Sequence, residues 1–182
     1  MKIQEIIDKH IDNEIEVDYY DGKVSMEVIR RFEKNIGYSL PKDFVDFSML
    51  KKFPLTIMVK EEVWPTSECG HVGPAWTSWK GFFCNSFSET ITEDCAIEEL
   101  FEDYADVNAV PFLQLQANSS SACFMKDKKI HQRDRNGYED YDLDMSFTDF
   151  FEGQVKELMN RKKQYKEWKD GKRKFYDSNF PF

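Results

Sequence analysis

The chain has 182 residues, of which 41% are hydrophobic and 15% aromatic, and its formal net charge is −9 at pH 7. This length fits one domain with residues left over for a tail or long loops, and the apolar content excludes a chain that is disordered throughout. The acidic balance disfavours nucleic-acid binding, because phosphates select Lys and Arg, and it suits solubility or a basic partner.

The first forty residues predict two helices. Residues 3–11 carry four isoleucines at helical spacing, which gives one narrow apolar face. A polar turn follows at Asp21-Gly22, and Ser25 then has the side chain of a helix N-cap. Apolar residues repeat at helical spacing over residues 28–36. Gly37 is suited to end that helix, because glycine readily adopts the left-handed conformation.

A further short helix is expected to begin at Leu40-Pro41, since proline at the first helical position loses no hydrogen bond. Its Phe44 and Phe47 would face inward. After this helix the pattern changes. Residues 55–59 predict a strand, and the segment 63–87, rich in Trp, Gly, Ser and Phe, indicates strands joined by irregular loops.

The second half predicts an inserted helix followed by strands. A capping-box spacing predicts a helix over residues 91–106. Residues 110–116 alternate like a strand, with Pro111 at its start or edge. Residues 122–126 and 129–132 predict two more strands, which a tight turn would pair.

A long amphipathic helix completes the pattern. Ser146 and Asp149 have capping-box-like spacing, and an apolar stripe follows as far as Met159, after which the composition turns basic. This order predicts an α+β fold with N-terminal helices, a mostly antiparallel sheet with an inserted helix, and a C-terminal amphipathic helix. We expect one domain over residues 1–160 and a basic, aromatic-containing tail over residues 161–182.

Charge is unevenly distributed along the chain. Residues 81–124 contain eight acidic residues and no Lys or Arg. Residues 156–174 contain nine basic and three acidic residues, a net charge of +6, so the rest of the chain carries −15. That exceeds the about 2–8 charges that suffice for the solubility of a small domain, and it favours a basic partner. The tail could contact other acidic surfaces, but its interleaved aromatic residues favour packing back on the acidic body.

We expect a cytoplasmic protein that does not interact with membranes. Residues 1–22 carry charges throughout and lack the apolar core of a signal peptide. No apolar run approaches the ~18 residues that a membrane span needs. The four cysteines form no C-x-x-C pair, and their thiols are expected to be reduced because the protein is expected in the cytosol.

Motifs for catalysis are missing from the sequence, which contains no phosphate-binding glycine loop and no Gly-x-Ser-x-Gly turn. Cys69-x-His71 is the element most like a metal site, and Cys84 and Cys95 could complete four ligands. The spacings match no zinc pattern, so buried or idle thiols are the simpler interpretation. We therefore expect no enzyme activity, no cofactor and no metal. A metal-dependent enzyme that uses Cys69, His71 and nearby acids is kept as an alternative.

Three segments together resemble the SUKH superfamily, which includes bacterial toxin-immunity proteins and fungal cell-wall regulators. Residues 29–44 (IRRFEKNIGYSLPKDF) resemble its opening signature, with a Phe-Glu pair, a glycine corner and a Leu-Pro helix start. Val110-Pro111-Phe112 is similar to the strand after its central helix, and residues 146–151 (SFTDFF) are similar to the start of its closing helix. The resemblance covers Ser25 to Leu158.

Two loops depart from the family's pattern. The family often has Asn-Gly after the second helix, where this chain has Lys51-Lys52-Phe53-Pro54, and Gly-Asp after the Pro-Phe strand, where it has Asn118-Ser119-Ser120-Ser121. The resemblance implies an α+β fold without enzyme activity and, for bacterial members, neutralisation of a cognate toxin, often a nuclease. A nuclease that grips nucleic acid is basic, which agrees with the acidic body.

The sequence thus predicts a non-enzymatic protein-binding module, an immunity protein that neutralises a basic toxin domain. Large aromatic residues in the loop-rich segment 64–87 suit an interface, although they could equally cover one face of the sheet. A regulatory or scaffold protein of the same fold is the second hypothesis, and the oligomeric state is left open. The residues expected to bind the partner are Glu61, Glu62, Trp64, Glu68, Trp76 and Trp79, with Asp140, Tyr141 and Asp142 as a second set.

Overall fold

A computed structural model describes residues 3–22, 24–71, 80–87, 96–116, 120–134 and 140–172. In these residues the chain forms five α-helices and one seven-stranded sheet, which confirms the predicted α+β class. The strands are β1 (Ile15–Asp21), β2 (Lys52–Val59), β3 (Gly81–Cys84), β4 (Val110–Gln116), β5 (Ser120–Phe124), β6 (Ile130–Asp134) and β7 (Asp140–Leu143). The helices are α1 (Ile3–His10), α2 (Met26–Ile36), α3 (Lys42–Ser48), α4 (Ile97–Glu102) and α5 (Phe147–Lys169), with a 3₁₀ helix η1 (Thr66–His71).

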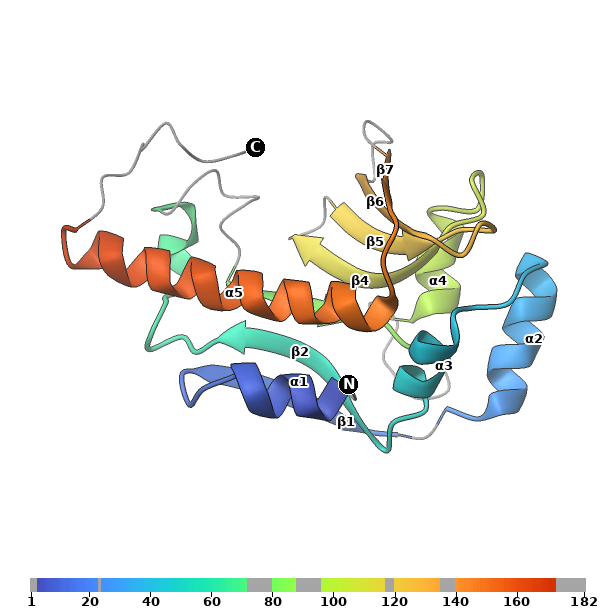
Figure 1. The fold of residues 1–182 in the computed structure, drawn as a ribbon, viewed down its shortest axis with the longest axis horizontal. Helices are drawn as coiled ribbons and strands as arrows, with labels where there is room; N and C mark the ends of the chain where they lie inside the picture. Colours follow the sequence, from blue (N-terminus) through green and yellow to red (C-terminus); the bar gives the residue numbers. More distant parts are fainter. Residues whose placement is uncertain are drawn as a thin grey trace.

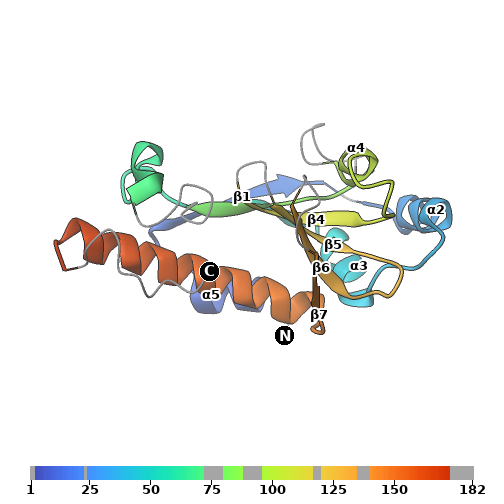
Figure 2. The same cartoon turned by 90° about the horizontal axis from the view of Figure 1, so that it is seen from above.

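The sheet is an antiparallel meander in which each strand pairs with the next one along the chain. Strands β1 and β7 are therefore its edges. Figure 1 shows α5 running along the sheet with α1 beside it. Figure 2 shows α5 and α1 on one side of the sheet, and η1 and α4 on the other. The sheet thus has one face covered by α5 and an opposite face near α4 and η1.

Phenylalanines join α3, the sheet and α5. The ring centroid of Phe44 on α3 lies 5.8 Å from that of Phe112 on β4 and 5.3 Å from that of Phe147 on α5. On β3, Phe82 contacts Phe151 of α5 with the ring centroids 5.9 Å apart. All five rings are buried, so α5 is docked by a continuous aromatic cluster.

The helical corner between α2 and α3 follows the sequence closely. Ser25 caps α2 by accepting a hydrogen bond from the amide of Val28, and Gly37 ends the helix at φ 82°. Pro41 lies one position earlier than predicted, at the N-cap of α3. The hydroxyl of Tyr38 lies 3.1 Å from the carbonyl oxygen of Phe124, which attaches the corner to β5.

The predicted helix over residues 91–106 is wrong at both ends where the structure can test it. Ala96 is extended and forms a parallel bridge with Ser86, and the amide of Ile97 donates to the carbonyl of Ser86 at 2.8 Å. These contacts hold Ala96 out of the helix, so α4 begins only at Ile97. It ends at Glu102 and is followed by turns, and residues 91–95 lie outside the described part of the chain.

Two edge strands and part of α5 were missing from the prediction. Strand β1 has alternating apolar and acidic residues, and β7 lies in an acidic stretch that does not look like a strand. Helix α5 continues ten residues beyond Met159, because Tyr165 on its later turns is buried. The predicted apolar stripe is therefore too short.

Gly81 and Gly153 offer a matched pair of substitutions. A Cβ atom at Gly81 would clash with Cγ of Met58 and would lie 2.5 Å from the carbonyl oxygen of Ile57, whereas a Cβ at Gly153 meets no atom within 4 Å. We expect Gly81→Ala to lower the free energy of unfolding by about 2 kcal/mol, because the strands must move apart. Gly153→Ala should raise it by about 0.5–1 kcal/mol, because alanine favours the helix. Urea denaturation of both variants tests this, and an unchanged Gly81→Ala midpoint would contradict the close packing of β2 and β3.

Candidate protein-binding surface

Trp64 lies in the core, so we correct its predicted role as an anchor for a partner. Its side chain has 0% exposure, and its indole stacks on the ring of Tyr165 with the centroids 4.8 Å apart. The indole nitrogen donates to the backbone carbonyl of Glu68 at 3.3 Å. A side chain without exposed surface cannot contact a partner, and the contact with Tyr165 instead fastens the later turns of α5.

Two of the predicted acids make contacts inside the chain. Glu61 is 63% exposed, but its carboxylate accepts hydrogen bonds from the buried ammonium of Lys80 and from the amide and hydroxyl of Thr66. The Lys80 contact, followed by those of Thr66, lowers the pKa of Glu61 to about 2. Glu68 accepts from the hydroxyl of Tyr165 at 2.6 Å and from the ammonium of Lys169 at 2.7 Å. Glu61 therefore joins the turn after β2 to Lys80, and Glu68 joins η1 to the later turns of α5.

The remaining predicted residues are placed only in part. Glu62 is exposed on the turn after β2. Asp140, Tyr141 and Asp142 lie on the edge strand β7, and their side chains are outside the described part of the structure. Trp76 and Trp79 are outside the described residues altogether, so their roles stay predictions.

The basic half of α5 packs back on the acidic body. The ammonium of Lys162 is almost buried and lies 3.0 Å from a carboxylate oxygen of Glu14, and it also pairs with Asp12. Lys166 pairs with Glu14 as well, and these two lysines lower the pKa of Glu14. Much of the positive charge of this segment is therefore neutralised by acids between α1 and β1, as its interleaved aromatic residues suggested.

Acidic side chains of β1 lie on the sheet face opposite α5. Val17 is in register with Ile57, which is in register with Phe82 on the α5 side. Because side chains alternate across a strand, the neighbours Glu16 and Asp18 point away from α5. Both are exposed, and the hydroxyl of Thr56 on β2 donates to Asp18 at 2.7 Å.

Apolar side chains extend this surface across the sheet. Met58 is in register with Glu16, and Phe83 is in register with Thr56, the partner of Asp18. Both side chains are half-buried. The surface therefore places partly exposed apolar groups beside two carboxylates, which is the composition of an interface that combines apolar contact with charge.

Helix α4 adds further acids on the same side of the sheet (Figure 2). Glu99 and Glu102 of this helix are exposed, and neither forms an ion pair with another described residue. We call the set Glu16, Asp18, Glu99 and Glu102, with Met58 and Phe83, the acidic face. The sequence indicates the negative charge near α4, but β1 was not predicted as a strand. The alternation of Ile15-Glu16-Val17-Asp18 is the signal that could have predicted it.

No three His, Cys, Asp or Glu side chains in the described segments come together in a way that could hold a metal ion. Cys69 and Cys84, from the alternative metal set, are both buried, and burial raises the pKa of the Cys69 thiol. The side chain of His71 and all of Cys95 lie outside the described residues. Among the described helices, none has the length and apolar character needed to cross a membrane.

Comparisons of the chain with protein-family models, with curated proteins and with solved structures find no match.

The two neighbouring acids Glu61 and Glu62 allow the internal role of Glu61 to be tested. Its pKa is lowered from 4.5 to about 2 in the folded protein, so its stabilising effect is complete above pH 4.5 and is lost as the pH falls toward 2. Glu61→Gln should therefore be less stable than the wild type at pH 7, and the difference should shrink in this acidic range. Thermal unfolding from pH 7 to pH 2 measures it. Glu62→Gln is the control, and equal effects of both substitutions would refute the Lys80 contact.

Proposed function

We propose that this protein is a non-enzymatic binding module of the immunity type, which occludes a basic toxin domain with its acidic face. The observation that carries this proposal is the position of the exposed acids. Glu16 and Asp18 on β1 and the acids of α4 lie on the side of the sheet that α5 leaves uncovered. The partner class comes from the SUKH resemblance, and the charge of the surface supports it.

Charge separation within the fold strengthens the argument. The lysines on the later turns of α5 pair with Asp12, Glu14 and Glu68, so they do not neutralise the acidic face. Exposed carboxylates that form no ion pair within the described segments raise the local negative potential. Such a surface accelerates association with a basic partner and repels an acidic one. A nuclease toxin has the required positive charge, because its substrate is a polyanion.

Apolar contact would supply the affinity that surface charges alone do not. Exposed ion pairs contribute little to binding, whereas desolvated apolar and aromatic groups near the centre of an interface contribute most. Met58 and Phe83 lie on the acidic face and are partly exposed. In this proposal they form the centre of the interface, and the acids of β1 and α4 surround them.

The direct test is co-purification of this protein with the product of a neighbouring toxin gene from a cytoplasmic extract of the source cell. We expect a stable complex and loss of toxin activity when this protein is in excess. A toxin that stays active and unbound under these conditions would exclude the immunity role. Binding to a cellular protein without any protection from a toxin would favour a regulatory or scaffold protein of the same fold.

Reversing charge on β1 tests which face is used. The double substitution Glu16→Lys and Asp18→Lys should slow association with the toxin domain about tenfold at low salt, because it removes the steering field, while dissociation changes less. The matched control is Asp8→Lys with Glu157→Lys, which makes the same charge change on α1 and α5. Binding kinetics at two salt concentrations measure both variants. Equal slowing by the two pairs would show that net charge matters and the acidic face does not.

A further inference from the structure

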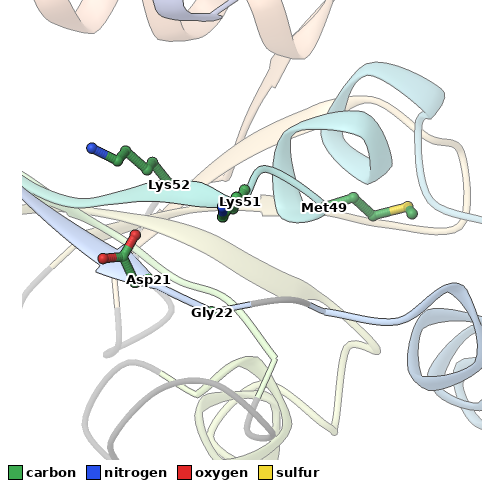
Figure 3. A pocket seen from close by; sticks show the side chains of 5 residues that line it. All are labelled: Asp21, Gly22, Met49, Lys51 and Lys52. Atoms are coloured by element: carbon green, nitrogen blue, oxygen red, sulfur yellow. The ribbon is translucent and has the colours of Figure 1, made fainter.

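A hollow of about 770 Å³ lies where β1 ends and β2 begins. Asp21 and Gly22 line one side, and the chain that links α3 to β2 lines the other with Met49, Lys51 and Lys52 (Figure 3). This volume is within the about 300–1,000 Å³ of pockets that hold small ligands or side chains. The hollow is therefore large enough for part of a bound peptide.

The two lysines give the hollow a positive edge. Lys51 and Lys52 are both exposed, and neither forms an ion pair in the part of the chain that the structure describes. They extend from adjacent positions in different directions (Figure 3). In a chain of net charge −9, this differs from α5, where Lys162, Lys166 and Lys169 all pair with carboxylates of the body.

Met49 makes the hollow partly apolar. Its side chain is half-buried at the C-cap of α3 and lies on the hollow's far side from Asp21 in Figure 3. The Met49 side chain points away from Lys51 and Lys52 (Figure 3), so an acidic peptide segment matches this combination better than a single carboxylate side chain does. Its carboxylates can accept hydrogen bonds from the ammonium groups while a neighbouring apolar group of the segment packs on the thioether.

We propose that the hollow receives a carboxylate-bearing segment of the same protein partner that the acidic face binds. This inference rests on the proposed function, because the hollow continues the acidic face: Lys52 is four residues from Thr56 on β2, an even spacing that places the two side chains on the same side of the sheet, and Asp18 and Asp21 are their register partners on β1. The interface is then bipolar. A basic surface of the partner lies on the acidic face, and an acidic segment lies along the hollow beside Lys51 and Lys52, so only one orientation satisfies both.

An experiment without any partner decides whether the hollow binds carboxylates. A hexaglutamate peptide is added to the ¹⁵N-labelled full chain at low salt, and amide shifts are followed. We expect saturable shifts at Gly22, Met49, Lys51 and Lys52 with a Kd below about 10 mM, and their loss in Lys51→Glu with Lys52→Glu. The absence of saturable shifts, or shifts that persist in the variant, would overturn the proposal even if a toxin partner is found.

An experiment with the toxin domain decides whether the hollow is part of the interface. For a basic partner, Lys51→Glu with Lys52→Glu should strengthen binding if only net charge matters, because it makes this protein more acidic. Our proposal predicts the opposite sign, a loss of affinity of about tenfold. The control is Lys34→Glu with Lys126→Glu, two exposed lysines elsewhere, which should not weaken binding. Equal or stronger binding by the Lys51 and Lys52 variant overturns the proposal. If the chain binds hexaglutamate at the hollow but binds no toxin, the immunity role is refuted and carboxylate binding by the hollow is not.

Discussion

Helix α5 is held against the sheet at two places, by the phenylalanine cluster near its start and by the stacking of Tyr165 on Trp64 near its end. The two contacts are far apart on a 23-residue helix, so they fix both its position and its direction along the sheet. Rings of this size each bury a large apolar area, and paired rings add a further geometric preference. The other features of the surface follow from this docking.

Docking of α5 decides how charge is distributed. Its later turns bring Lys162 and Lys166 to the segment between α1 and β1, where they form ion pairs with Asp12 and Glu14. Lys162 is nearly buried, and an ion in that position needs a partner because removal of either charge leaves the other without solvation. The lysines of α5 are thus paired with acids between α1 and β1, and they do not neutralise the acids on the sheet face that α5 leaves uncovered.

The parts of the fold that could be predicted are those set by local chemistry. Ser25 and Gly37 define α2 because capping and left-handed conformations depend on a few adjacent residues. The start of α4 could not be predicted, because Ala96 is drawn into a bridge with Ser86, ten residues earlier. Trp64 shows the same limit for the candidate site. A tryptophan near prolines and glycines suits an interface and a core equally well, and only the distant Tyr165 decides between them.

The position of Lys51 and Lys52 connects the family resemblance with the surface. The resemblance implies that these residues replace an Asn-Gly that is common in SUKH proteins. In this chain Lys51 precedes β2 and Lys52 is its first residue. Two lysines there give positive charge to a strand end whose preceding residues are acidic. Binding specificity changes more readily at loops than in the core, because core positions such as Phe44 and Phe147 are fixed by packing. A loop beside the acidic face is a place where specificity can change at little cost to the fold.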